Sequence, residues 1–325
     1  MHIVQVLSGQ IRQYKRSAIL TPVFTLLEVL MEILIPFVTA SLIDQGIQAG
    51  NMEQILHYGL IMLIMAFASL LFGILGGVFA SDASTGFAAN LRDSMYANIQ
   101  TFSFSNIDKY STAGLVTRMT TDVTNLQNAF MMIIRIAVRA PLMMIIALVM
   151  CIVISPKISL IFLGALVILG AFLVVVIGRA SEAFRATFRK YDDLNASVQE
   201  NVSAIRVVKA FVREDYEKTK FNKAVEELYR LFVRAEKLVV MNMPVMTLIV
   251  DACIIGVSWF GAHQIVGGTM TTGELTSLFS YIMMVLFSLM MVSMIFVMMT
   301  MSAASAQRIC EVLEEKPDIC NPEKP

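Results

Sequence analysis

The chain has 325 residues, of which 57% are apolar and only 15% are charged. Soluble globular domains contain roughly 45–50% apolar residues, so this composition indicates a helical membrane protein. The 25 basic and 25 acidic residues balance, and this neutrality favours neither a nucleic acid nor an acidic substrate as a partner. The four cysteines are scattered and form no CxxC pair, so we expect neither a structural disulfide nor a metal site.

The chain begins with an expected interfacial helix over residues 1–16. Three apolar residues share one face of this helix and three basic residues follow: Ile3, Leu7, Ile11, then Arg12, Lys15 and Arg16. About 20 apolar residues cross a bilayer, and on this rule residues 17–306 form a transmembrane domain of six spans. These spans lie near 17–43, 54–80, 131–154, 158–178, 238–265 and 274–301.

The basic residues are distributed very unevenly over the connections between the spans. The first, third and fifth connections are short and hold only Lys157 of the 25 Lys and Arg residues. The others lie in the termini, in the long loops at about 81–130 and 179–237, and at the start of the third span. The positive-inside rule therefore predicts a multi-pass cell-membrane protein with both termini and both long loops in the cytosol.

The most informative stretch is Leu194–Phe221, which is polar and densely charged within this apolar chain. Apolar residues nevertheless recur at steps of three and four from Phe184 to Val212, which is typical of one helical face. A single helix from Gly178 to Phe211 would be about 50 Å long at about 1.5 Å per residue. The same spacing resumes after Phe221, so we predict a cytosolic helical hairpin whose charged tip is Phe211–Glu217.

Three stretches resemble ABC exporters of the bacterial multidrug-type branch, and together they extend the resemblance to nearly the whole chain. The hairpin is similar to the second intracellular loop of that family, with Ala204 where the pattern usually has glycine. Its matching residues are Glu200, Ile205-Arg206-Val207-Val208-Lys209-Ala210-Phe211, Glu214, Glu217 and Phe221. Residues 106–118 with Asp122 resemble the first intracellular loop, with Ala113 where the glycine is expected. Residues 302–317 resemble the exit from the sixth span toward the nucleotide-binding domain.

The resemblance implies an all-α membrane protein of the ABC exporter type, with six transmembrane helices and two long cytosolic helical extensions. It implies two such halves, identical or different, that dimerise in the lipid bilayer and move small amphipathic compounds or lipids outward. Residues 307–325 would be a linker toward a nucleotide-binding domain. The implied coupling residues are Asn106, Ile107, Asp108, Lys109 and Tyr110, and Phe211, Arg213, Glu214, Asp215, Tyr216 and Glu217.

The energy source is expected on partner domains rather than on this chain. The sequence contains no GxxxxGK[ST] motif, which is the loop that cradles the phosphates of ATP. The resemblance therefore implies that ATP and Mg²⁺ bind to the expected nucleotide-binding domains. We expect no cofactor and no catalytic residue in the chain itself.

Charged residues inside membrane spans are costly and often functional. Glu28 and Glu32 lie one turn apart on the first span, Arg135 and Arg139 one turn apart on the third, and Asp251 lies within the fifth. In one interpretation the acids pair with the arginines and lock the bundle. In the other, an acid lines a cavity for cationic substrates. The sequence favours the structural role for the arginines, because they lie near the interface where long side chains reach water, and leaves both roles open for the acids.

Methionine is unusually frequent, with 24 residues, of which eight lie between positions 283 and 301. Flexible, polarizable methionine side chains suit a promiscuous binding surface, but they also fill gaps between helices. In the resembled family the sixth span lines the translocation path. The candidate cavity residues are therefore Glu28, Glu32, Asp251, Met290, Met294 and Met298.

Two other classes of membrane protein fit the sequence less well. A voltage-gated channel needs arginines that repeat along its fourth span, and residues 160–177 contain none. An ion-driven secondary transporter is expected to show internal repeats and spans broken by Gly or Pro at matching positions, and neither is evident. ATP-driven export is therefore the predicted function, with these two classes as its alternatives.

Overall fold

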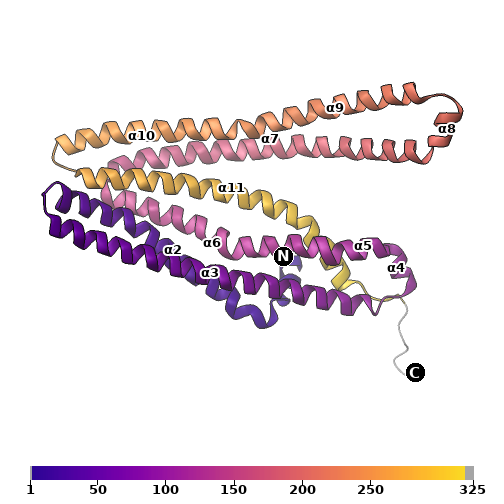
Figure 1. Ribbon diagram of the computed structural model, residues 1–325, viewed down its shortest axis with the longest axis horizontal. Coiled ribbons are helices and arrows are strands. Elements are labelled where there is room, and N and C mark those ends of the chain that lie inside the picture. Colours follow the sequence, from indigo (N-terminus) through magenta and orange to yellow (C-terminus); the bar gives the residue numbers. More distant parts are fainter. Residues whose placement is uncertain (1, 319–325) are drawn as a thin grey trace. The chain divides into compact units, whose positions relative to one another are not determined.

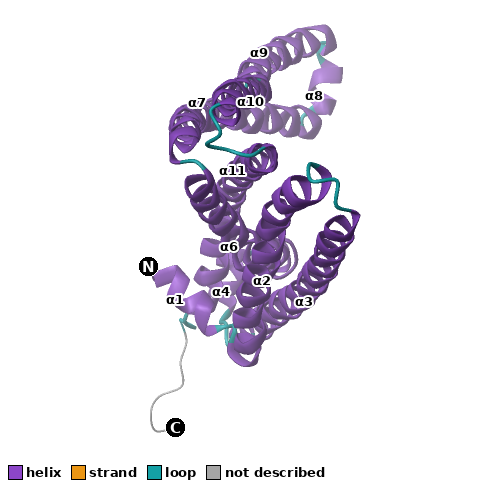
Figure 2. Ribbon diagram, turned by 90° about the vertical axis from the view of Figure 1, so that its left-hand side faces the viewer, coloured by secondary structure: helices purple, strands orange, loops and turns teal. Residues whose placement is uncertain are grey.

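The structure is a computed structural model that describes residues 2–318. The described residues form helices joined by short connections and contain no β-strand (Figures 1 and 2). Six of these helical segments are long and apolar enough to cross a membrane. They are Arg12–Ile47, Met52–Ile99, Thr112–Ile154, Pro156–Ser203, Glu214–Val266 and Thr272–Val292. The predicted all-α fold with six spans is thereby confirmed.

The helices that can cross a membrane range from 25 to 48 residues. They are α2 (Lys15–Ser41), α3 (Met52–Ile99), α6 (Val123–Ile154), α7 (Pro156–Ser203), α10 (Asn242–Val266) and α11 (Thr272–Glu314). Shorter elements join them: α1 (His2–Gly9), η1 (Arg12–Tyr14), η2 (Leu42–Ile47), α4 (Phe104–Tyr110), α5 (Thr112–Thr117), η3 (Arg118–Asp122), α8 (Ile205–Ala210) and α9 (Glu214–Val240). α3 and α7 have 48 residues each. At about 1.5 Å per residue each is roughly 70 Å long, more than twice the roughly 30 Å hydrocarbon core of a bilayer.

Local sequence signals explain where several helices begin. The Asn51 side chain accepts hydrogen bonds from the first backbone N–H groups of α3. Thr271 and Glu274 form a reciprocal capping box at the start of α11. Pro156 occupies the first position of α7, where its missing N–H group costs nothing.

The chain forms two compact units, one made of residues up to Ser159 and from Val257 onward, the other of Leu160–Gly256. In the first unit α2, α3, α6 and α11 pack against one another (Figure 1). Two α11 side chains tie α11 to the backbone of α2: Tyr281 donates to the carbonyl of Ile33 at 2.9 Å, and Ser277 donates to that of Pro36 at 2.6 Å. Hydrogen bonds of this kind fix the register of two membrane helices.

One apolar cluster of this unit lies in the extensions rather than in the spans. It joins α3, α5, α6 and α11 through Phe87, Ala88, Leu91, Met95, Leu115, Val123, Leu126, Ala306, Ile309 and Val312. All of its members belong to the predicted first long loop or follow the predicted sixth span. The first long loop is therefore a packed helical bundle, and this bundle positions the short helix α4.

The N-terminal segment was predicted as one interfacial helix over residues 1–16, but α1 ends at Gly9 and a second helical turn, η1, follows. Arg12 adopts a left-handed backbone conformation, with φ at 43°, and donates to Ser94 on α3 at 2.8 Å. The Tyr14 ring lies against Gly86, where a Cβ atom would come within 2.3 Å of the ring. The segment thus packs on α3, and Met1 lies outside the described residues.

In the second unit, α7 and α9 run antiparallel and α8 joins them at their ends (Figure 1). The predicted helical hairpin is present, but the prediction of one helix from Gly178 to Phe211 is wrong. α7 ends at Ser203, and Ala204 leaves the helical region with φ at −94° and ψ at 14°. The carbonyl of Ala204 accepts from Val207 and Val208, which starts the separate helix α8.

The predicted linker at 307–325 begins as helix, because α11 continues to Glu314. Residues 315–318 leave the helix, and residues 319–325 lie outside the described part of the chain.

Candidate functional site

The tip of the second-unit hairpin is a short helix followed by a tight reversal. α8 ends at Ala210, and Val212 adopts φ at 53°, a left-handed conformation that is strained for a β-branched residue. The Lys209 ammonium contacts the Glu214 carboxylate at 3.0 Å across the reversal. Asn201 near the end of α7 donates to Glu217 on α9 at 2.8 Å. The first contact joins α8 to α9, and the second joins α7 to α9.

The tip exposes apolar and aromatic side chains. Phe211 is 74% exposed, Val212 is 81% exposed and Tyr216 is 61% exposed. Arg213 is exposed as well, and its guanidinium lies over the Tyr216 ring at 5.8 Å from the ring centre. Aromatic side chains within a charged rim are typical of the anchors of protein–protein interfaces. The exposed tip is therefore a candidate docking surface.

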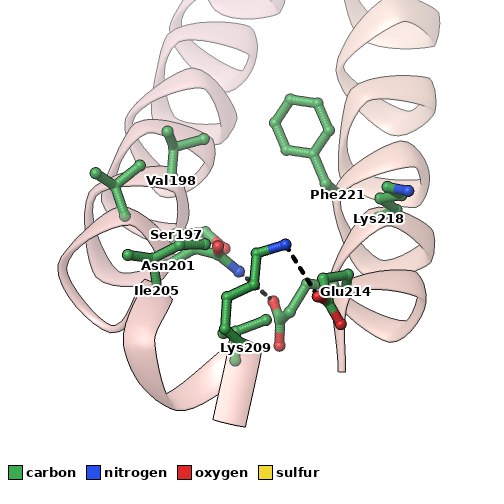
Figure 3. A pocket seen from close by; sticks show the side chains of 11 residues that line it. Ser197, Val198, Asn201, Ile205, Lys209, Glu214, Lys218 and Phe221 are labelled. Atoms are coloured by element: carbon green, nitrogen blue, oxygen red, sulfur yellow. Dashed lines mark hydrogen bonds and ion pairs between the residues drawn. The ribbon is translucent and has the colours of Figure 1, made fainter. Parts of the chain in front are cut away.

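Behind the tip, the two arms leave a groove of about 380 Å³, shown in Figure 3. The Lys209–Glu214 ion pair closes the end of this groove nearest the tip (Figure 3). The lining residues come from α7, α8 and α9: Ser197, Val198, Asn201, Val202, Ile205, Val208, Lys209, Glu214, Glu217, Lys218 and Phe221. The arms of the hairpin are therefore not fully packed against each other near the tip.

The predicted coupling residues of the first loop lie on or next to the short helix α4, but most of them contact their own chain. Asn106 is buried and donates to the Glu315 carboxylate at 3.0 Å. Lys109 contacts the same carboxylate at 2.9 Å, and Tyr110 donates to it at 2.7 Å. These hydrogen bonds hold the pKa of Glu315 below its usual range, and the contact with Glu315 raises the pKa of Lys109. Asp108 is exposed and Ile107 is partly buried.

A second polar cluster joins η3 to the C-terminal part of α11. Asp122 is 2% exposed and accepts a hydrogen bond from Ser305 at 2.9 Å and another from Arg308 at 2.8 Å. Arg118 contacts Glu311 at 3.0 Å. Because a buried carboxylate needs several donors, this cluster fixes the extension of α11 against the start of α6.

In the membrane-spanning part of the first unit, one arginine holds both predicted cavity acids of α2. Arg139 donates to Glu28 at 2.6 Å and to the two oxygens of Glu32 at 2.7 and 2.8 Å. Glu28 is only 7% exposed. Its carboxylate lies beside Gly73, where a Cβ atom would stand 3.0 Å from one of its oxygens. This pairing favours the interpretation in which the charges lock the bundle over the one in which Glu28 or Glu32 binds a cation.

The other predicted cavity residues are placed differently. Asp251 is exposed on α10, and it makes no ion pair within residues 2–318. On α11, Met294 is 59% exposed, whereas Met290 and Met298 are partly buried. Within the described residues, Arg135 donates a single hydrogen bond, to the backbone carbonyl of Gly73 at 3.5 Å. Asp251 belongs to the second unit, whereas the other predicted cavity residues belong to the first.

Comparison with known proteins identifies the family. The family model of the ABC transporter transmembrane region matches residues 18–290. The chain belongs to this family.

Three relatives of this ABC transporter transmembrane region illustrate its range. "Uncharacterized ABC transporter ATP-binding protein YfiB" of Bacillus subtilis is 30% identical over 308 residues, which cover 95% of this chain and 54% of YfiB. The "ATP-dependent lipid A-core flippase" of Desulfotalea psychrophila is 30% identical over 213 residues, covering 64% of this chain and 36% of the flippase. The "Fatty acid ABC transporter ATP-binding/permease protein" of Mycobacterium tuberculosis is 26% identical over 209 residues, covering 64% and 33%.

The curated relatives are considerably longer than this chain. The ABC transporter transmembrane region described here spans about half of the length of the curated relatives that it matches over nearly all of its own length.

Sequence reasoning missed three features of this ABC transporter transmembrane region. It placed the hairpin tip at Phe211–Glu217 and so left out the short helix α8. It also missed Phe104, which is 88% exposed at the start of α4, and Glu315, which binds α4. For α4 a signal was available, because Ser103 and Asn106 form a capping box that marks a helix start at Phe104.

Proposed function

We propose that this chain is the transmembrane half of an ATP-driven exporter that moves amphipathic compounds, such as lipids, outward by alternating access. The observation that supports this most strongly is the shape of its extensions. Helices of 48 residues carry short helices far beyond the membrane, and the tip of the hairpin exposes Phe211 and Tyr216. A stiff helical lever transmits a rigid-body displacement between its two ends without bending. Such levers suit coupling between a membrane cavity and a domain that hydrolyses ATP.

The proposed partners follow from the family and from the relatives. The relatives that match nearly all of this chain are named as ATP-binding proteins and are almost twice as long as it. The sequence here contains no ATP-phosphate loop, so ATP and Mg²⁺ would bind to nucleotide-binding domains that rest on the hairpin tip and on α4. A second half, identical or different, would complete the substrate cavity. Two relatives are named for lipid A-core and for fatty acids, and both names support an amphipathic substrate.

The proposed topology predicts which sites are accessible from outside the cell. A variant without Cys320 offers a low labelling background, because the other three cysteines are buried. In this background, cysteine at Ala49 or at Val266, which is 90% exposed, should react with an impermeant thiol reagent in intact cells. Cysteine at Asp215 should react only after the membrane is opened, because the positive-inside rule places the hairpin tip in the cytosol. Labelling of the Asp215 variant in intact cells would contradict the topology.

A cationic substrate, if the exporter accepts one, should depend on Asp251 rather than on Glu28 or Glu32. Both α2 acids bind Arg139, whereas Asp251 is exposed on an apolar helix. Asp251→Asn is therefore expected to lower the export of a cationic amphiphile roughly tenfold, because about 1.4 kcal/mol of lost attraction corresponds to a factor of ten. Export of a neutral amphiphile with the same ring system should change less than twofold. An equal loss for both compounds would show that Asp251 has a structural role.

A further inference from the structure

The short helix α4 has two faces with different chemistry. The face that bears Asn106 and Tyr110 is turned toward the residues that leave α11, and Asn106 is only 1% exposed. The opposite face exposes Phe104 and Asp108. Three of the five coupling residues predicted on α4, namely Asn106, Lys109 and Tyr110, thus contact Glu315 of their own chain. The large apolar side chain of Phe104, which was not among the predicted coupling residues, is exposed instead.

Glu315 is the centre of the contacts on the inner face. Its carboxylate accepts from Asn106, Lys109 and Tyr110, and so it binds three of the seven residues of α4. Its backbone carbonyl accepts from the Asn98 side chain at 2.9 Å, which ties the same residue to the end of α3. We call these contacts of Glu315 with Asn98, Asn106, Lys109 and Tyr110 the Glu315 clasp.

Further contacts extend the clasp on both sides. The Asn106 side chain also donates to the backbone carbonyl of Lys316 at 3.1 Å. Ser105 donates to the side chain of Asp318 at 2.8 Å. The Arg118 guanidinium lies over the Tyr110 ring, 4.7 Å from its centre. The start of the chain that leaves α11 therefore runs along α4 and is hydrogen-bonded to it over residues 315–318.

The clasp matters because a helix as short as α4 is unstable by itself. Isolated helices shorter than about 12–15 residues are marginal in water, and α4 has seven residues. Its capping box supports only its first turn. The orientation of its exposed face must then come from the contacts of its inner face, and the Glu315 carboxylate supplies three of them. Loss of Glu315 would therefore loosen α4 and the direction of Phe104.

Phe104 has the properties of an interface anchor. It is 88% exposed, more than any other aromatic residue on the described part of the chain. It is flanked by the polar residues Ser105 and Asp108, as expected for an apolar anchor within a polar rim. Its position next to the chain that leaves α11 favours one occupant, namely an ATP-binding domain of the kind that the longer relatives are named for.

We propose that Glu315 is a positioning residue that holds α4 so that Phe104 anchors the ATP-binding domain. This inference rests on the proposed function and assigns the docking role of α4 to its outer face. The chain that leaves the sixth span and the first docking helix then move together as one body. A displacement of the ATP-binding domain would reach α11 both through the chain itself and through the clasp.

The test measures substrate-stimulated ATP hydrolysis in the assembly that contains the ATP-binding domain. Phe104→Ala should weaken docking roughly 30-fold, as expected for an aromatic anchor. It should lower the maximal stimulated rate and leave the substrate concentration for half-maximal stimulation within a factor of two. Val116→Ala is the matched control, because Val116 is an apolar residue that is 61% exposed on the neighbouring α5.

Glu315→Gln should produce the same loss of maximal rate, and amide hydrogen exchange in α4 should become about tenfold faster. Asp93→Asn is its control, because Asp93 is another ion-paired acid of the same unit and contacts Arg12 rather than α4 or Arg118. Unchanged exchange in the spans will show that the variants are folded. The inference is overturned if Phe211→Ala uncouples the assembly while Phe104→Ala and Glu315→Gln do not, or if exchange in α4 does not respond to Glu315→Gln. If none of the three variants uncouples, the proposed function itself fails.

Discussion

Arg139→Gln is expected to prevent stable assembly of the membrane domain. The substitution leaves the two carboxylates of Glu28 and Glu32 inside the bundle without their guanidinium partner. Removing one partner of a buried ion pair typically costs about 3–5 kcal/mol. Because whole domains are stable by only about 5–15 kcal/mol, this loss is decisive. The measurement is the yield and the thermal midpoint of the detergent-purified protein.

Two further variants separate the charge pairing from other effects of the substitution. Arg135→Gln lies one helical turn away and removes only a long contact with the backbone carbonyl of Gly73. It should therefore assemble nearly normally. The triple variant Glu28→Gln/Glu32→Gln/Arg139→Gln should recover most of the lost yield, because no uncompensated charge remains. If Arg139→Gln is as stable as the original protein, the acids are not held by this pairing.

The tip of the second-unit hairpin should be needed for coupling but not for substrate binding. Phe211→Ala in the complete assembly removes an aromatic side chain that is 74% exposed and available to a partner. Truncation of an interface anchor costs about 2 kcal/mol or more, which weakens docking roughly 30-fold. Substrate should still bind with its original affinity. Transport and the stimulation of ATP hydrolysis by substrate should both fall at least tenfold.

Tyr216→Ala should have a smaller effect in the same direction, because Tyr216 already stacks with Arg213 of its own chain. Tyr229→Ala is the matched control for both variants. Tyr229 is an aromatic residue on the same helix and is 65% exposed, but it lies more than three turns from the tip. Normal coupling in Phe211→Ala and Tyr216→Ala together would mean that the tip is only a solvated turn.

The overall fold could be predicted because its signals are local. Runs of about 20 apolar residues marked the six spans, and the period of three to four marked the helical hairpin of the second long loop. The bounds of α8 could not be predicted in the same way. Ala204 ends the preceding helix, yet alanine has the highest helix propensity of all residues, so the break comes from the folding back of the hairpin.

The partners of charged residues could not be predicted either, because they lie far apart in the sequence. Arg139 and Glu28 are separated by 111 residues, and Asn106 and Glu315 by 209. The pattern of charges within each span left two interpretations of Glu28 and Glu32 open, and only the packing of α2 against α6 favours one. The same holds for α4, where the resemblance to ABC exporters identified the segment but not the face that its own chain covers.

The most direct measurement is the ATP-dependent uptake of a labelled amphiphile into inside-out membrane vesicles that contain the complete assembly. We predict uptake that requires ATP and Mg²⁺, that is insensitive to ionophores which collapse ion gradients, and that is lost in Phe211→Ala. Uptake that continues without ATP and stops when the ion gradients are collapsed would contradict the account and favour an ion-driven transporter.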